Sequence, residues 1–245
     1  MIARPILIVA AALVLSSCAT TSTPPEARHE ADPWEPLNRS VYQFNSGADR
    51  LILRPLSRAY TTITPDPVET GLGNFFTNLR SPTTIINLLL QGRAGDAGRQ
   101  FHRLFVNTVF GLGGLIDLTG RAGLEHFEED FGQTFAVWGW SDSRYLVLPF
   151  LGPSTVRDGF GSAADLERLV IRRELFGDTT GDIVTATNIL HVRATLLPLD
   201  REIEQALDPY LFVRDSYLQR RSHQISDGEQ GLPDYEAFLK EGSGP

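Results

Sequence analysis

Four prolines, each at the head of a segment with helical periodicity, constrain the fold of this chain more than any other feature. Pro36 suits the first turn of a helix, where no backbone N–H is required, and Asp66-Pro67, Ser81-Pro82 and Asp208-Pro209 carry the same start signal. The apolar residues behind Pro36 recur at spacings of three and four, at Leu37, Val41, Phe44 and Ala48. The sequence therefore predicts mostly α-helical structure, with one helix starting at Asp66 and another at Ser81.

Helical periodicity continues along the chain, whereas strand signals are few. From Asp96 onward an apolar stripe is formed by Phe101, Leu104, Phe105, Thr108 and Val109. Later helices are predicted at 165–176, 182–197 and 208–224. The best strand candidate is Arg144–Phe150, and Pro149 limits its length. The predicted fold class is mostly α, compact, with little or no sheet.

The N-terminus has the organisation of a bacterial secretion signal. Arg4 provides the positive charge, and Ile6–Leu15 is a run of ten apolar residues, too short for a bilayer span of about 20 residues. Leu15-Ser16-Ser17-Cys18 follows and is similar to the lipobox of bacterial lipoproteins, with Ser17 where glycine or alanine is commoner. We therefore expect cleavage after residue 17 and lipidation of Cys18. An ordinary signal peptide with an incidental cysteine is the alternative.

Cysteine usage and charge narrow the class further. Cys18 is the only cysteine, which excludes a disulfide scaffold and a multi-cysteine metal site. Ala19-Thr20 lack the aspartate that commonly marks inner-membrane retention in lipoproteins, which favours the periplasmic face of the outer membrane. The formal charge of −8 disfavours nucleic acid as a partner. The domain prediction is a lipoprotein signal peptide at 1–17, a flexible tether at 18–31, a helical domain at 32–225 and a disordered acidic tail at 226–245.

Three internal segments suggest more than a generic helical domain. Residues 82–91 are apolar on nearly all sides, so this helix is either buried or inserted among acyl chains. Gly111–Ile116 lacks the Lys-Ser/Thr pair of a phosphate-binding loop and predicts tight turns. Gly120–Gly132 is polar and acidic, and we expect a mobile loop with Gly139 as a further pivot. A solvated loop without a role is the alternative.

No catalytic, cofactor or metal site is predicted. Ser154 is the best nucleophile candidate, but it lacks the second glycine of a nucleophile elbow and better fits a helix cap. The histidines form no ligand pair. The acidic cluster Glu125, Glu128, Glu129 and Asp130 lacks the spacing of a calcium loop and is interpreted as a solvated face.

An ordered series of motifs resembles the MlaA (VacJ) lipoprotein family. The series opens with Asp32-Pro33-Trp34-Glu35-Pro36-Leu37-Asn38-Arg39 and Tyr42-Gln43-Phe44-Asn45. It continues with Asn74-Phe75, Asn78-Leu79, Pro82, Asn87, Leu90-Gln91-Gly92, Arg103-Leu104-Phe105-Val106-Asn107-Thr108, Gly111-Leu112-Gly113-Gly114 and Asp117. Glu129-Asp130-Phe131-Gly132-Gln133-Thr134, Val147-Leu148-Pro149, Gly152-Pro153-Ser154-Thr155, Arg157-Asp158, Asp208-Pro209-Tyr210 and Tyr217 complete it. Residues 140–144 depart from the glycine-rich sequence of many relatives, which questions a hinge role there.

The resemblance implies a helical, ring-like lipoprotein lying in the inner leaflet of the outer membrane beside trimeric porins. Such proteins maintain lipid asymmetry by passing misplaced phospholipids through an amphipathic channel to a soluble periplasmic carrier, MlaC. It implies neither an enzyme nor a cofactor. A structural porin- or envelope-associated lipoprotein without transport and a lipid hydrolase are the alternatives.

A lipid path needs apolar walls for acyl chains and polar groups for the headgroup. Phe44 with Asn45, and Asn87 within an apolar run, are residue types that such a path would use. With the resemblance, they give the candidate lipid path Phe44, Asn45 and Asn87, and the candidate gating loop or hinge Gly120, Gly132 and Gly139. Plain core packing is the alternative for Phe44.

Overall fold

The computed structural model describes residues 30–165 and 172–226. The predicted signal peptide, Cys18, nearly all of the tether and the tail beyond Ser226 lie outside these ranges, as does much of the helix predicted at 165–176. The boundaries proposed for those segments stay predictions.

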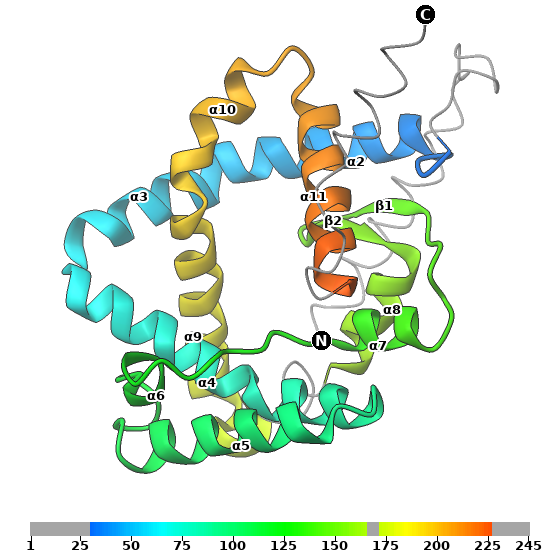
Figure 1. Ribbon diagram of the computed structural model, residues 1–245. Coiled ribbons are helices and arrows are strands. Elements are labelled where there is room, and N and C mark those ends of the chain that lie inside the picture. Colours follow the sequence, from blue (N-terminus) through cyan, green and yellow to red (C-terminus); the bar gives the residue numbers. More distant parts are fainter. Residues whose placement is uncertain (1–29, 166–171, 227–245) are drawn as a thin grey trace, which may run out of the picture.

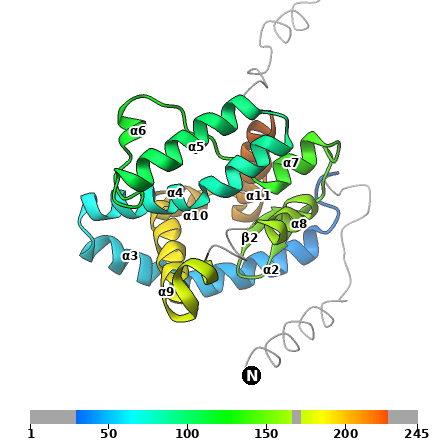
Figure 2. The same cartoon turned by 90° about the horizontal axis from the view of Figure 1, so that it is seen from below.

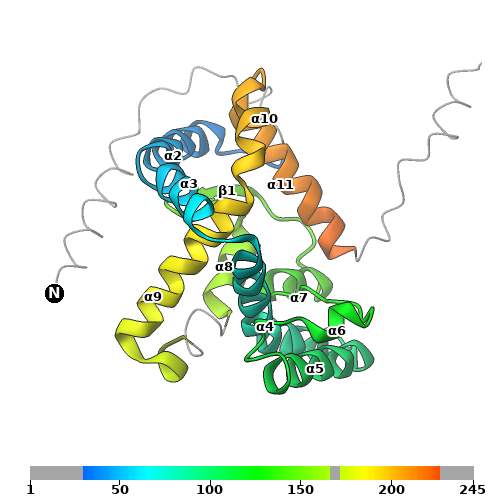
Figure 3. The same cartoon turned by 90° about the vertical axis from the view of Figure 1, so that its left-hand side faces the viewer.

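Helices follow one another around a ring, as Figures 1 and 2 show. In chain order the elements are α2 (Glu35–Ala48), a π-helical turn (Asp49–Leu53), α3 (Arg54–Ile63), α4 (Asp66–Leu90), α5 (Ala94–Val109), α6 (Leu118–Arg121), α7 (Phe131–Val137), β1 (Tyr145–Leu148), β2 (Gly152–Thr155), α8 (Val156–Ala164), α9 (Arg172–Thr195), a 3-10 turn (Leu197–Leu199), α10 (Asp200–Gln205) and α11 (Pro209–Ile225). Helix α9 packs against α3 and contacts α4, and in Figure 3 the lower part of its ribbon diverges from α4 and α5. The predicted ring-like, mostly α fold is confirmed.

Helix α4 is one continuous helix, so the prediction of a separate helix starting at Ser81 is wrong. An interior proline costs about 3 kcal/mol because it removes a backbone hydrogen bond. Contacts with α5 hold the chain helical on both sides of Pro82. Gln100 Nε2 donates to the buried hydroxyl of Ser81 (3.1 Å), and Asn78 Nδ2 donates to Thr108 Oγ1 (2.9 Å).

The end of α4 agrees with the sequence prediction at Gly92. This glycine has φ +81°, a left-handed conformation that glycine adopts without the steric cost of a side chain. Its N–H donates to Leu89 O (3.0 Å), and the N–H of Arg93 donates to Leu88 O (2.8 Å). These two bonds form a Schellman motif, which satisfies carbonyls at the helix end.

A short antiparallel hairpin interrupts the helical ring. The predicted strand at Arg144–Phe150 is confirmed as β1, which pairs with β2 so that Tyr145 faces Thr155 and Leu148 faces Gly152. No sequence pattern indicates β2, because glycine and proline are unfavourable in strands. A two-stranded sheet has only edge strands, where proline is tolerated. Thr155 then caps α8, its side chain accepting from the N–H of Asp158.

Buried polar contacts attach α2 and α11 to this hairpin. The Asp32 carboxylate accepts hydrogen bonds from Asn38 Nδ2 (2.8 Å) and Tyr210 Oη (2.5 Å). Asn38 Oδ1 in turn accepts from the N–H of Val147 (2.9 Å). Burial together with the neighbouring Asp32 carboxylate raises the pKa of Tyr210 well above its usual value. The Asp32–Asn38 motif of the sequence therefore links segments that are far apart in the chain.

The glycine-rich segment after α5 forms tight turns, as predicted. Leu112, Gly113 and Gly114 have φ of 56°, 72° and 97°. A Cβ at Gly111 would lie 2.3 Å from Ile116 O, and one at Gly114 would lie 2.5 Å from Asn78 Cβ. Close backbone packing therefore explains glycine at both positions.

Candidate functional site

Helix α5 presents its apolar face to the outside and its polar face to the protein interior. Phe101, Phe105 and Val109 are 58%, 52% and 56% exposed. The buried side includes Gln100 and Arg103. Arg103 donates from Nη2 to Asp117 Oδ2 (2.9 Å) and from Nη1 to Leu124 O (2.7 Å). This arrangement is the reverse of a helix on a water-soluble domain.

The same inversion holds around the ring. Among the described residues, 22 buried residues are polar or charged and nine are hydrophobic. Exposed large apolar side chains recur on several elements, including Leu51, Ile52, Leu56, Phe110, Leu112, Trp138, Phe160 and Ile183. Large apolar side chains exposed on so many elements indicate an apolar surrounding medium. No helix in 30–165 or 172–226 combines the length and hydropathy that a membrane crossing requires.

The ring encloses a cavity of about 620 Å³ between α4, α9, α11 and the segment that leads into α7. Its wall mixes apolar side chains, including Phe76, Leu79 and Ile189, with polar and charged ones. A second cavity of about 250 Å³ shares Leu151 and Arg221 with the first and extends toward the hairpin. The interior therefore offers an amphipathic path with both kinds of surface.

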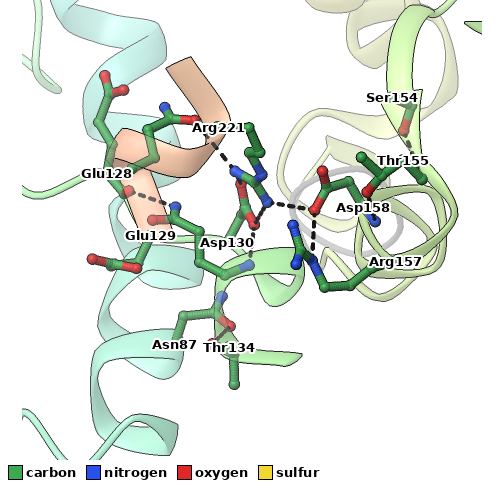
Figure 4. Close-up of polar contacts among 12 residues, drawn as sticks. Asn87, Glu128, Glu129, Asp130, Thr134, Ser154, Thr155, Arg157, Asp158 and Arg221 are labelled. Atoms are coloured by element: carbon green, nitrogen blue, oxygen red, sulfur yellow. Dashed lines mark hydrogen bonds and ion pairs between the residues drawn. The ribbon is translucent and has the colours of Figure 1, made fainter. Parts of the chain in front are cut away.

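A buried charge network around Arg221 joins three elements of the cavity wall (Figure 4). Arg221 donates from Nη1 to Asp130 Oδ2 (2.7 Å), and from Nη2 to Asp130 Oδ1 (2.6 Å) and Asp158 Oδ1 (2.9 Å). The Tyr217 hydroxyl donates to Asp158 Oδ2 (2.8 Å). Burial raises the pKa of Asp158, but Arg221 outweighs that effect and the pKa lies below its usual value. No sequence pattern identifies Arg221, because a lone arginine has no spacing that reveals its partners.

The candidate residues Phe44 and Asn45 contact the turn of the hairpin. Asn45 Nδ2 donates to Leu148 O (2.9 Å), and the N–H of Phe150 donates to Asn45 Oδ1 (2.8 Å). The rings of Phe44 and Phe150 meet edge to face at 5.1 Å. Phe44 is 49% exposed, so the core-packing alternative for it is wrong. The next residue of the turn, Leu151, lines both cavities.

Asn87 lies in a different position from Phe44 and Asn45. It is fully buried, accepts from Thr134 Oγ1 (2.7 Å) and donates to Thr83 O (2.9 Å). The Gln91 amide, one turn further along α4, donates to Thr134 Oγ1 (3.1 Å) and to Glu129 Oε2 (2.9 Å). Asn87 thus joins α4 to α7 behind the wall that Thr83 contributes to the larger cavity.

The candidate hinge glycines have three different surroundings. Gly120 lies in α6 and donates its N–H to Asp117 Oδ1 (2.8 Å). Gly132 lies in α7, where a Cβ would be 2.4 Å from both Arg221 Nη2 and Asp158 Oδ1. Gly139 follows α7 with φ +111° and open space around it. Their role as hinges stays a prediction.

The acidic cluster is only partly a solvated face. Glu125 and Glu128 are exposed, as expected. Glu129 is buried and its Oε1 accepts from Arg93 Nη1 (2.9 Å), and Asp130 pairs with Arg221, so the prediction is wrong for these two residues.

The remaining candidates for chemistry are a serine nucleophile and a metal site. The Ser154 hydroxyl is buried in β2 and donates to Thr155 O (3.1 Å). Within the ranges that the structure describes, no three His, Cys, Asp or Glu side chains are grouped to hold a metal ion.

Comparisons with known proteins agree with this architecture. A family model described as MlaA lipoprotein matches residues 30–224. The chain is 36% identical over 220 residues to the "intermembrane phospholipid transport system lipoprotein MlaA" of Escherichia coli K12, covering 88% of this chain and 86% of that protein. The protein of the same name from Haemophilus influenzae is 29% identical over 231 residues, covering 91% and 92%.

A solved structure gives the same result for the fold. It was described under "Structural basis for maintenance of bacterial outer membrane lipid asymmetry" and aligns with a TM-score of 0.70 at 32% identity. The alignment covers 80% of this chain and all of the other. The match of a family model to most of the chain, together with these relatives and the shared fold, shows that the chain belongs to the MlaA lipoprotein family.

Proposed function

We propose that the protein is an outer-membrane lipoprotein that maintains lipid asymmetry by passing phospholipids from the outer leaflet through its ring. The observation that carries this proposal is the inverted polarity of the ring, in which an apolar perimeter surrounds a cavity with a mixed polar and apolar wall. The names of the relatives in Escherichia coli and Shigella flexneri, which refer to intermembrane phospholipid transport, support it.

The proposal places the ring in the inner leaflet, anchored through the lipid on Cys18. The exposed apolar side chains of α3, α5 and α7 would contact acyl chains, which removes their apolar area from water. A trimeric porin would stand beside the ring, and a soluble periplasmic carrier of the MlaC type would receive the lipid. The protein itself acts as a passage and not as an enzyme.

Phe44 and Asn45 hold the hairpin turn in place. They would affect lipid passage by controlling the position of this turn. Because Leu151 of that turn lines both cavities, displacement of the turn changes the path inside the ring. The segment from Gly120 to Gly132, with Gly139, would permit the movement, and Asn87 would keep α4 and α7 together during it.

The proposal is tested by the amount of phospholipid exposed on the surface of cells that lack the protein. We expect a rise on deletion, restored by wild type and not by Cys18→Ala. No rise on deletion, with the porin still co-purifying, would favour a structural lipoprotein over a transport component. Hydrolysis of phospholipid by the purified protein, lost in Ser154→Ala, would instead favour a lipid hydrolase.

A further inference from the structure

We infer that the larger cavity contains a binding station for a zwitterionic headgroup, with Arg80 and Arg220 contacting its phosphate and Glu128 contacting its amine. The inference rests on the proposed function and specifies its substrate class: a phospholipid whose headgroup carries both a phosphodiester and a primary ammonium group.

Three exposed charged side chains line the cavity, two of them positive and one negative. Arg80 comes from α4, Arg220 from α11 and Glu128 from the segment before α7. The pKa of Glu128 lies below its usual value because of His126, whose Nε2 is 3.7 Å from Glu128 Oε1, and because of the positive charges of Arg80 and Arg220. The carboxylate is therefore ionised at neutral pH and within electrostatic reach of both arginines.

The buried charges of the same wall are engaged with one another. Arg221 pairs with Asp130 and Asp158, and Glu129 pairs with Arg93. In Figure 4 the Glu128 carboxylate points away from this network. The exposed charged side chains of the wall, which a ligand in the cavity can reach, are two cations and one anion.

Several buried polar atoms of the cavity wall have no hydrogen-bond partner among the described residues, including His126 Nδ1, Arg221 Nε and two further atoms that add to the site. The hydroxyl of Thr83, a residue only 5% exposed, has no hydrogen-bond partner among the described residues. Oδ1 of Asn188 also has none among them. A buried polar atom without a partner is costly, and a bound polar group would satisfy it. An amide oxygen accepts hydrogen bonds and donates none, so Asn188 Oδ1 suits an ammonium group and not a phosphate.

The chemistry of these groups favours a zwitterion over an anionic headgroup. A guanidinium fork matches phosphate oxygens. A glycerol headgroup brings no positive charge to Glu128, whereas an ethanolamine headgroup places an ammonium there. Phe76, Leu79 and Ile189 supply apolar wall for the acyl chains of the same molecule.

The test compares phosphatidylethanolamine with phosphatidylglycerol of the same acyl chains, mixed in equal amounts with the full-length protein in detergent. Bound lipid is identified by mass spectrometry. We expect wild type to enrich the ethanolamine lipid about two- to fivefold, the range of one exposed ion pair. Glu128→Gln should bring the ratio to about one, and Arg80→Gln with Arg220→Gln should reduce both lipids. Glu125→Gln is the matched control, because Glu125 is exposed in the same segment and does not line the cavity.

Each result separates this inference from the proposed function. Bound lipid without enrichment, or an unchanged ratio in Glu128→Gln, overturns the headgroup station and leaves transport standing. Failure of wild type to bind either lipid counts against the proposed function itself. Glycerophosphoethanolamine, which has no acyl chains, is added at the lipid concentration in a separate sample. Displacement of the lipid by it would assign the station to a soluble compound and overturn the lipid assignment.

Discussion

The contact between Asn45 and the hairpin turn permits a quantitative prediction. Asn45→Ala removes two hydrogen bonds, one to Leu148 O and one from the N–H of Phe150. At about 1 kcal/mol net for each bond, the turn loses about 2 kcal/mol of local stability. Phe150 also has φ +63°, a left-handed conformation that costs a non-glycine residue about 1–2 kcal/mol. Opening the turn releases this strain, so the remaining contacts resist opening only weakly.

Hydrogen–deuterium exchange at the Phe150 amide measures this opening. A loss of about 2 kcal/mol predicts exchange about 30-fold faster in Asn45→Ala, with little change at β1. Asn74→Ala is the control, because it removes a single exposed hydrogen bond to Leu115 O, away from the turn. Equal exchange at Phe150 in wild type and Asn45→Ala would refute the assignment of Asn45 as the residue that holds the turn. In cells, the same substitution should change the level of surface-exposed phospholipid.

Three further predictions test packing, electrostatics and the apolar perimeter. Gly132→Ala forces a Cβ to within 2.4 Å of the Arg221–Asp158 pair and should destabilise the fold by about 1–3 kcal/mol; in thermal unfolding, Gly98→Ala, which has open space, should not lower Tm. Burial raises the pKa of Asp117, but hydrogen bonds from its neighbours lower it to about 2 from 3.8. Its contribution of about 2 kcal/mol is therefore complete above pH ~4 and lost as pH falls toward ~2, a loss that Asp117→Asn should remove from acid-unfolding curves. Phe105→Glu in a Cys18→Ala background should reduce co-sedimentation with phospholipid vesicles at least about fivefold, since Phe105 is 52% exposed and burying half of a Phe side chain contributes about 1 kcal/mol; unchanged co-sedimentation would contradict membrane contact of α5.

Local rules account for most helix positions in this fold. A polar residue followed by proline marked the starts of α4 and α11 correctly, and Gly92 marked the end of α4. The same rule was wrong at Ser81-Pro82, because hydrogen bonds from α5 keep the helix continuous through the proline. That information is tertiary, and no local pattern contains it.

Only part of the candidate site could be predicted from the sequence, for the same reason. Asn45 could be selected as a residue type that suits a lipid path, but its partners Leu148 and Phe150 are more than 100 positions away. Glu129 and Asp130, which the sequence placed on a solvated face, form ion pairs with Arg93 and Arg221. Long-range pairing of charges depends on how the ring closes, which the periodicity of single helices does not encode.

The sequence also does not encode which face of α5 points inward. An amphipathic helix has the same periodicity whether its apolar stripe faces a core or a surrounding lipid phase. Here Gln100, Arg103 and Asn107 occupy the inner face, where each has hydrogen-bond partners across the ring wall. Polar groups paired in this way can be buried without large cost, and the apolar stripe is then left on the outside. Exposure of that stripe to water would oppose folding, whereas the acyl chains of the proposed membrane location would remove the penalty. The polar interior and the membrane location are thus two consequences of one choice of helix orientation.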